Sequence, residues 1–319
     1  MSEQLMFGYM TYLSYHMWDD EYTQPRGWYM KNRYNVNNEV DLGVWDEMVR
    51  FLAEHKYNAL LIDVGDAIRY ESHPEICAPD AWDKDFLKKK LDEIRALGIE
   101  PIPKLNFSTC HHTWLKEYRR MVSTPIYYQV CSDLIAEVAE VFDNPRLFHL
   151  GLDEEDTVGN QRLRECVHIR CEELWWHDVY FYLNEVEKRG MRPWVWADPC
   201  FEKPDAFLSR MPKSVMMSNW FYNYFRIWPE DHWHSKAIKT YELLDKAGFD
   251  QIPTASCYEI GSYNVFQTLA HGKAVLSPEL LKGYMVAPWK PIIPDNIYHL
   301  KNDAYSLYCA RRDLYPETL

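Results

Sequence analysis

The stretch Ala96-Leu97-Gly98-Ile99-Glu100-Pro101-Ile102-Pro103-Lys104-Leu105-Asn106 contains the pattern that decides the fold. An amphipathic segment ends at a glycine, and a short, mostly apolar run follows and stops at a polar side chain. Glycine is favoured just past a helix end because it adopts left-handed backbone angles without a steric penalty. The same order of helix, glycine and strand recurs around Gly190 and Gly248. The pattern predicts a chain in which helices and strands alternate.

Eight apolar runs of strand length can be placed along the chain. We expect strands at residues 5–12, 59–64, 100–106, 147–152, 193–197, 215–220, 251–256 and 283–288. Helical or helix-initiating patterns lie at 44–55, 83–97, 126–142, 163–189, 235–247 and 278–281. The connection 199–214 is poor in helix signals, and 13–43 has the composition of a long first loop.

Repeated strand-helix units with nearly continuous apolar strands favour a parallel sheet, and eight such units favour closure into a barrel. No linker, repeat or low-complexity block divides the chain. The sequence therefore predicts the α/β class and a single (β/α)8 TIM barrel, with residues 1–319 as one catalytic domain.

Composition narrows the class of partner. A net charge of −13 argues against nucleic acid, whose binders need a basic surface. No apolar stretch reaches membrane-spanning length and residues 1–15 lack a secretion-signal pattern, so no membrane partner is expected. Eight cysteines without a C-x-x-C pair are typical of thiols in a reducing cytoplasm. The 13 Trp and 23 Tyr suit rings that stack on a carbohydrate substrate. No cofactor is indicated, and a homo-oligomer remains open.

Polar and aromatic side chains follow most of the expected strands. In a barrel, the carboxyl ends of the strands face the active site. Besides the acidic run after the fourth strand, the candidates for substrate binding are Asp63, Asp66, Asn106, His111, His112, Trp196, Asp198, Trp220, Tyr258, Glu259 and Trp289. Carboxylates and aromatic rings at one barrel mouth are what the hydrolysis of glycosidic bonds requires. By contrast, we expect His16, His232, His234 and His271 to serve packing or the surface.

The acidic run at residues 153–156 follows the fourth expected strand. Four ionised carboxylates in a confined site repel one another, so at least one is expected to keep its proton near neutral pH and to act as a general acid. The alternative role is capping of the next helix. Capping is the expected role of Glu155 and Asp156, and charge repulsion alone leaves both roles open for Asp153 and Glu154.

The segment His149-Leu150-Gly151-Leu152-Asp153-Glu154 resembles the His-x-Gly-Gly-Asp-Glu signature of glycoside hydrolase family 20, the hexosaminidase group. Residues 57–76 are similar to the stretch of that family around its second strand. Residues 99–106, with His111 and His112 downstream, are similar to its third-strand segment. The three blocks occur in the family's order over residues 57–156.

The resemblance implies that Glu154 is the general acid. It also implies that Asp153 orients the 2-acetamido group of the substrate, whose carbonyl oxygen replaces an enzyme nucleophile. His149 would brace the loop, and Trp196, Trp220 and Trp289 would wall the sugar. The long segments 13–43 and 221–234 can close a barrel mouth into a pocket, so we expect a glycosidase that acts in the exo mode on a terminal sugar.

Some positions depart from the family pattern. Leu152 replaces the second glycine, Lys104 replaces a glutamate, no arginine lies in residues 8–14, and Trp289 lacks a nearby glutamate. A different glycoside, or loss of the acetamido requirement, would follow from these changes. An enzyme carboxylate would then have to act with Glu154, and the candidates are Asp63, Asp198 and Glu259.

Two other functions fit the same residues. Glu154, Asp198 and Glu259 with His111 or His112 would bind a divalent metal in a sugar isomerase or epimerase, although the hydrolase interpretation requires no metal. A barrel that binds sugar without catalysis is the second. Finally, the aromatic run at residues 220–225 is expected to be a pocket wall, a subunit contact or core packing.

Overall fold

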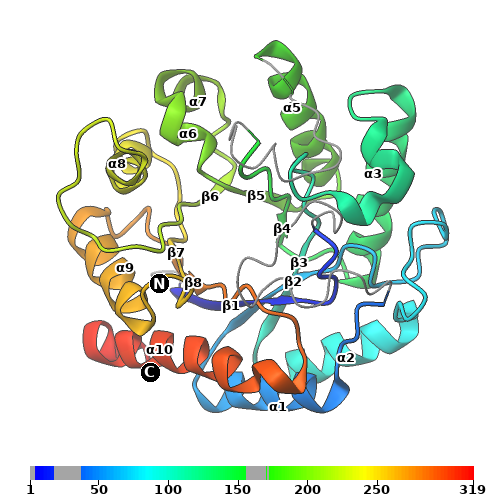
Figure 1. Ribbon diagram of the computed structural model, residues 1–319, viewed down its shortest axis with the longest axis horizontal. Helices are drawn as coiled ribbons and strands as arrows, with labels where there is room; N and C mark the ends of the chain where they lie inside the picture. The colour runs from blue at the N-terminus through cyan, green and yellow to red at the C-terminus, as the bar shows by residue number, and fades with distance from the viewer. Residues whose placement is uncertain (1–3, 18–36, 156–169, 171) are drawn as a thin grey trace.

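A computed structural model of the chain describes residues 4–17, 37–155, 170 and 172–319. Eight strands form one parallel sheet in the order β6-β5-β4-β3-β2-β1-β8-β7. They are β1 Met6–Tyr12, β2 Ala59–Asp63, β3 Glu100–Lys104, β4 Leu147–His149, β5 Arg192–Trp196, β6 Met216–Ser218, β7 Thr254–Ala255 and β8 Gly283–Val286. Two isolated parallel bridges, Met217 to Gln251 and Trp220 to Thr254, join β6 to β7. The sheet is therefore a nearly closed barrel, as predicted (Figure 1).

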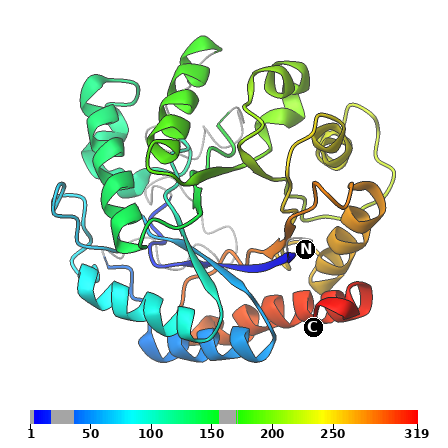
Figure 2. The same ribbon diagram turned by 180° about the vertical axis from the view of Figure 1, so that it is seen from behind.

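Helices surround the sheet on its outer side (Figures 1 and 2). They are α1 Leu42–Glu54, α2 Lys84–Ala96, α3 Pro125–Val141, α5 Glu173–Glu187, α6 Pro199–Glu202, α7 Pro204–Arg210, α8 Trp233–Lys246, α9 Ser262–Val275 and α10 Ile297–Leu314. Within the residues that the structure describes, 3-10 helices lie in the connections and at the carboxyl end: η2 Thr113–Arg120, η3 Pro294–Asn296 and η4 Pro316–Thr318. No helix in the described part of the chain is both long and apolar enough to span a bilayer.

The helix ends follow the expected chemistry. The side chains of Asp41 and Asp83 accept hydrogen bonds from backbone amides in the first turns of α1 and α2. Gly98, Gly190 and Gly248 have φ angles of 79°, 78° and 79° just after α2, α5 and α8. The left-handed backbone that these three junctions need is therefore present at all three.

The helix predictions differ from the structure at the 278–281 segment, in the 199–214 connection and at the carboxyl end of the chain. Residues 278–281 form a turn, and the helix between β7 and β8 is α9. Its pattern is obscured by Gly272, which lies so close to Tyr284 of β8 that a Cβ atom would come within 2.7 Å of the ring hydroxyl. The 199–214 connection contains the short helices α6 and α7, and α10 was not expected. The start of the predicted helix at 163–189 lies outside the described residues, and α5 forms its second half.

The barrel interior is set by the alternation of side chains along each strand. In β2, Leu60 and Ile62 pack with the helices, whereas Ala59 and Leu61 belong to an inner cluster with residues of other strands such as Met10, Ile102, Trp194 and Met285. Asp63 and Lys104 continue the inward-facing positions of β2 and β3. Two ionisable side chains are thus placed inside the barrel, beneath its carboxyl-terminal mouth.

Candidate active site

The buried floor of the site is an ion pair. Lys104 Nζ contacts Asp63 Oδ2, and both side chains are at most 2% exposed. The two residues are register partners in β3 and β2, so the sheet itself brings them together. Burial raises the pKa of Asp63, although the ammonium of Lys104 opposes this effect. Asp63 is therefore occupied by Lys104 and is a poor partner for Glu154.

Asp153 and Glu154 follow β4 and converge on one imidazole. His111 Nε2 lies 3.2 Å from Asp153 Oδ2 and 3.0 Å from Glu154 Oε2. Asn106 Nδ2 donates to the other oxygen of Asp153 at 2.9 Å. Asp153 is buried, and the side chain of Glu154 is 32% exposed. The two carboxylates predicted to react are therefore adjacent, and Glu154 is the one that solvent can reach.

The pKa values of His111 and Asp153 are shifted in opposite directions. Burial alone would lower the pKa of His111, but Asp153 and Glu154 raise it to about 9. Burial alone would raise the pKa of Asp153, but the charges of His111 and Lys104 hold it below its ordinary value. At neutral pH, His111 is therefore a cation and Asp153 is an anion.

The loop after β4 has an unusual backbone. Gly151, Leu152 and Glu154 have φ angles of 73°, 68° and 60°. For a residue with a side chain, the left-handed region costs roughly 1–2 kcal/mol, and such strain collects at functional sites. Leu152 adopts the conformation expected of the glycine that it replaces in the family signature. The loop therefore holds Leu152 and Glu154 in backbone conformations that favour glycine, at an energetic cost.

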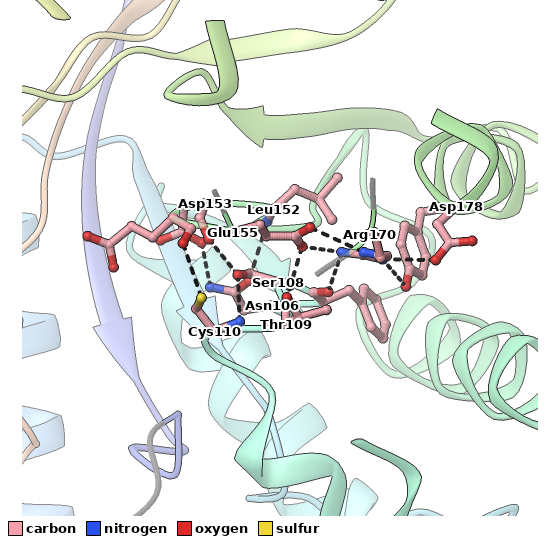
Figure 3. Close-up of polar contacts among 12 residues, drawn as sticks. Asn106, Ser108, Thr109, Cys110, Leu152, Asp153, Glu155, Arg170 and Asp178 are labelled. Carbon is pink, nitrogen blue, oxygen red and sulfur yellow. Dashed lines mark hydrogen bonds and ion pairs between the residues drawn. The ribbon is translucent and has the colours of Figure 1, made fainter. Parts of the chain in front are cut away.

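Side chains of the loop after β3 hold that backbone in place (Figure 3). Asn106 Oδ1 accepts from the Leu152 amide at 3.3 Å. Ser108 Oγ donates to the Asp153 carbonyl at 2.5 Å, and Cys110 Sγ donates to the Glu154 carbonyl at 3.1 Å. A Cβ atom on Gly151 would lie 1.9 Å from Asn106 Oδ1. The two loops therefore fit together only because residue 151 is glycine.

Asp198, after β5, supports Glu154 from the other side. Its Oδ2 accepts from the Glu154 amide at 2.8 Å, and its Oδ1 accepts from Trp220 Nε1 at 3.1 Å. Burial, followed by the negative charge of Asp153, raises the pKa of Asp198. The Asp198 carboxyl thus accepts hydrogen bonds from the Glu154 backbone and from the indole of Trp220.

Glu155, for which capping was expected, makes buried contacts with the loop after β3 and with Arg170. Its carboxylate pairs with Arg170, accepts from the Thr109 amide at 3.1 Å and is buried (Figure 3). Arg170 also contacts Asp178 Oδ2 at 3.2 Å. Glu155 is therefore connected through Arg170 to Asp178 of α5. Asp156 lies outside the described residues.

Aromatic rings cover the interior side of the mouth. The Trp196 ring lies 6.3 Å from that of Trp289 and 4.6 Å from that of His149. Tyr222 lies 6.2 Å from Trp289 and stacks on Trp220 at 5.2 Å. The three tryptophans expected as walls are thus linked into one aromatic surface through Tyr222. His149 is fully buried, and its Nδ1 accepts from the Gly151 amide, as a bracing residue would.

Asp66 is the centre of a separate group of hydrogen bonds and ion pairs. It accepts from Ser14 Oγ at 2.7 Å and contacts His16 Nδ1 at 2.8 Å and Lys116 Nζ at 2.7 Å. His16, expected to serve packing or the surface, forms an ion pair with Asp66 when it is protonated. Both carboxylate oxygens of Asp66 are engaged in joining the loops after β1, β2 and β3.

The remaining candidates divide between core and rim. His112 is buried and precedes η2. Tyr258 and Glu259 are exposed beyond β7, and Asn223 donates to Glu259. Sequence reasoning missed Ser108, Cys110, Arg170 and Tyr222. Only Tyr222 had a usable signal, since it lies two residues after Trp220 in the aromatic run.

The described residues contain one group with the ligand chemistry for a metal ion. One donor atom each from His111, Asp153 and Glu154 lies within 4.8 Å of the others. This differs from the expected set, because the oxygens of Asp198 accept hydrogen bonds from Glu154 and Trp220. Nitrogen with carboxylate oxygen is a donor set that Zn²⁺ accepts.

A hollow of about 780 Å³ lies at the opposite end of the barrel. Its rim includes Arg146, paired with Glu100 at 2.8 Å, and Arg192, paired with Asp250 at 2.8 Å. Charged pairs at the amino-terminal face of a barrel serve stability, whereas chemistry occurs at the carboxyl ends of the strands. We therefore place the candidate site around Glu154.

No protein-family profile and no curated protein matches the sequence. Solved structures do match. An exo β-N-acetylglucosaminidase of glycoside hydrolase family 20 from Vibrio harveyi, in an inactive mutant form, aligns over 99% of this chain with a TM-score of 0.60 and 13% identity. A chitobiase from Flavobacterium johnsoniae aligns over 88% (TM-score 0.62, 15% identity), and an N-acetyl-β-hexosaminidase from Streptomyces plicatus over 94% (0.59, 13%).

The chain spans 58%, 49% and 62% of the lengths of these three proteins. At this level of identity, the likeness establishes a shared fold. The barrel is that of the structurally matched hexosaminidases, in agreement with the sequence resemblance.

Proposed function

We propose that residues 1–319 form one catalytic domain of a glycoside hydrolase that removes a terminal N-acetylhexosamine. The observation that carries the proposal is the pairing of Asp153 and Glu154 on His111 at the mouth of a hexosaminidase-like barrel. The same two acids occupy the positions that the family signature assigns to acetamido orientation and acid catalysis. Trp220 and Trp289 are joined by Tyr222 into one aromatic cluster, and the buried Trp196 packs against Trp289.

In the proposed first step, Glu154 donates its proton to the oxygen that bridges the two sugars. The bond from the anomeric carbon to that oxygen breaks, and the leaving group departs as an alcohol. The acetamido carbonyl oxygen forms a new bond to the anomeric carbon, and positive charge spreads over the resulting ring. Asp153, held as an anion by His111, stabilises that charge through the amide N–H.

In the second step, water attacks the anomeric carbon. The Glu154 carboxylate takes the proton of the water, and the bond to the acetamido oxygen breaks. The substrate supplies the nucleophile at high effective concentration, so no second enzyme carboxylate is needed. The geometry supports a nucleophile from the substrate, since Asp63 is paired with Lys104 and Asp198 accepts a hydrogen bond from the Glu154 backbone.

The test compares 4-nitrophenyl N-acetyl-β-glucosaminide with 4-nitrophenyl β-glucoside. We expect hydrolysis of the first only, and a decrease of kcat by about 10²–10⁴ in Glu154→Gln and in Asp153→Asn. Glu100→Gln, at the opposite end of the barrel, is the control and should retain full activity. Equal hydrolysis of both glycosides would exclude the acetamido mechanism, and binding without hydrolysis would indicate a non-catalytic barrel.

A metal-dependent sugar isomerase or epimerase is the second candidate. It is favoured by one observation, the convergence of donor atoms from His111, Asp153 and Glu154. Measurement of metal bound to the purified protein, with activity assays on free sugars before and after chelation, separates the two. A stoichiometric metal whose removal abolishes sugar isomerisation would replace the hydrolase proposal.

A further inference from the structure

The hollow at the amino-terminal end of the barrel differs in charge from the chain as a whole. Its volume of about 780 Å³ lies within the range of small-molecule sites, about 300–1,000 Å³. Among the described residues that line it, four are basic and two are acidic, whereas the whole chain has 35 basic and 48 acidic residues. The basic residues are Arg95, Arg146, Arg192 and Lys282. The hollow therefore has a surplus of positive side chains on an acidic protein.

Arg146 and Arg192 lie side by side at the start of β4 and β5. Leu147 of β4 is the register partner of Arg192, and the Arg192 amide donates to the Arg146 carbonyl at 2.8 Å. Both residues line the hollow. Like charges on neighbouring strands repel each other, so an anion between these two guanidinium groups would be stabilised by both.

The carboxylate partners of these two arginines use only part of each guanidinium. Arg146 contacts Glu100 through Nε, at 2.8 and 3.0 Å from the two carboxylate oxygens. Arg192 donates through Nε to the Ser214 carbonyl and through Nη1 to Asp250 at 2.8 Å. Within the described part of the chain, both Nη atoms of Arg146 and Nη2 of Arg192 stay available to another acceptor. Guanidinium groups that present such donors match the oxygens of a phosphate group.

The other residues around the hollow indicate the class of ligand. A phosphate monoester carries close to two negative charges and three acceptor oxygens, so it can bind both arginines at once. Lys282, whose Nζ lies 3.6 Å from Asp250 Oδ1, adds a third positive charge. Gln4 and Asp143 also line the hollow and offer hydrogen-bond partners to hydroxyl groups. The volume leaves room for an organic group attached to the phosphate.

We propose that the hollow binds a phosphate monoester of a sugar or polyol, with the phosphate group between Arg146 and Arg192. The ligand is held there without reaction, because the chemistry of barrel enzymes occurs at the carboxyl ends of the strands. The inference goes beyond the proposed function and does not depend on it, since the two arginines and Glu154 lie at opposite ends of the barrel.

The test is calorimetric titration of the full chain at pH 7.5 and low salt, where the phosphate group is mainly a dianion. The probes are glucose 6-phosphate, glucose and inorganic phosphate. We expect glucose 6-phosphate to bind most tightly, and added salt to weaken its binding. Arg146→Met and Arg192→Met should each raise its Kd about tenfold, because each removes hydrogen bonds to a charged group.

Two further variants serve as controls, and circular dichroism checks that each variant is folded. Lys203→Met removes an exposed cation, paired with Glu172 at 2.9 Å, from the connection after β5 at the other end of the barrel. It should leave the Kd of glucose 6-phosphate unchanged. Arg146→Lys keeps the charge but loses the planar donors, so its Kd should lie between those of wild type and Arg146→Met. Arg146→Lys also tests the site should the methionine variants fail to fold.

Four results would overturn the inference. Glucose could bind as tightly as glucose 6-phosphate, or the arginine variants could leave the Kd unchanged. Inorganic phosphate could bind as tightly as the ester, which would identify a site for a simple ion. Finally, Lys203→Met could weaken binding as much as Arg146→Met, which would indicate a general effect of net charge.

Discussion

Replacing Arg170 by Met would test how the loop that carries Glu154 is held. The guanidinium is 1% exposed and pairs with Glu155 and Asp178, which are 5% and 0% exposed. It also contacts the Tyr182 hydroxyl at 3.1 Å and the Phe107 carbonyl at 3.2 Å. Methionine keeps much of the volume but leaves two carboxylates buried without their cation.

Removing one partner of a buried ion pair costs about 3–5 kcal/mol, since it leaves an uncompensated charge. Asp178 retains hydrogen bonds from Ser123 Oγ at 2.6 Å and Tyr128 at 2.5 Å, and Glu155 retains the hydrogen bond from the Thr109 amide. Because both carboxylates keep donors, we expect a decrease of about 3 kcal/mol in the free energy of unfolding, at the lower end of that range. This loss is smaller than the free energy of unfolding of a typical domain, about 5–15 kcal/mol, so we expect the variant to fold.

The measurement is urea unfolding at pH 7, with kcat determined well below the transition. Adding Glu155→Gln to Arg170→Met should recover part of the lost stability, because the neutral amide needs no cation. Arg312→Met removes an exposed pair with Asp313 and should change stability by less than about 1 kcal/mol. A loss below about 1 kcal/mol in Arg170→Met, or no recovery in the double variant, would refute the charge argument.

Three further changes test the loop and the charge cluster. Gly151→Ala should cost at least about 1–2 kcal/mol and reduce kcat/KM, because φ is 73° and the new Cβ displaces Asn106 from Asp153; unchanged kinetics would contradict this. Leu152→Gly relieves about 1–2 kcal/mol of strain but loses a buried side chain worth about 2–5 kcal/mol, so urea unfolding should show a net loss. Because the pKa of His111 is raised to about 9, its pairing with Asp153 stabilises the fold fully below the ordinary pKa of 6.5 and less as pH rises through about 9. Because the pKa of Asp153 is lowered, the stability that its carboxylate contributes is lost in acid below 3.8. The difference in unfolding free energy between wild type and His111→Asn should therefore be larger at pH 6 than at pH 10, and a constant difference would contradict the assignment.

Local patterns in the sequence predicted the barrel because they are encoded within single elements. Apolar runs marked all eight strands, and glycines marked helix ends. Strand lengths were overestimated, as in β7, which spans only Thr254–Ala255 and is preceded by Pro253, a residue with no amide hydrogen to donate to the ladder. The helix α9 was missed because Gly272 weakens the helical signal and is explained only by its contact with Tyr284.

By itself, the sequence determined the order of the eight strands, the end of the barrel on which polar residues collect, and the segment containing Asp153 and Glu154. These follow from periodicity and from the rule that strand ends share a face. Tertiary structure alone decided which charges meet: Lys104 with Asp63, His111 with both acids, and Arg170 with Glu155. Such pairings join residues 15 to 43 positions apart, and they depend on sheet register and loop geometry, because electrostatic and hydrogen-bond energies change over fractions of an ångström that no local pattern records.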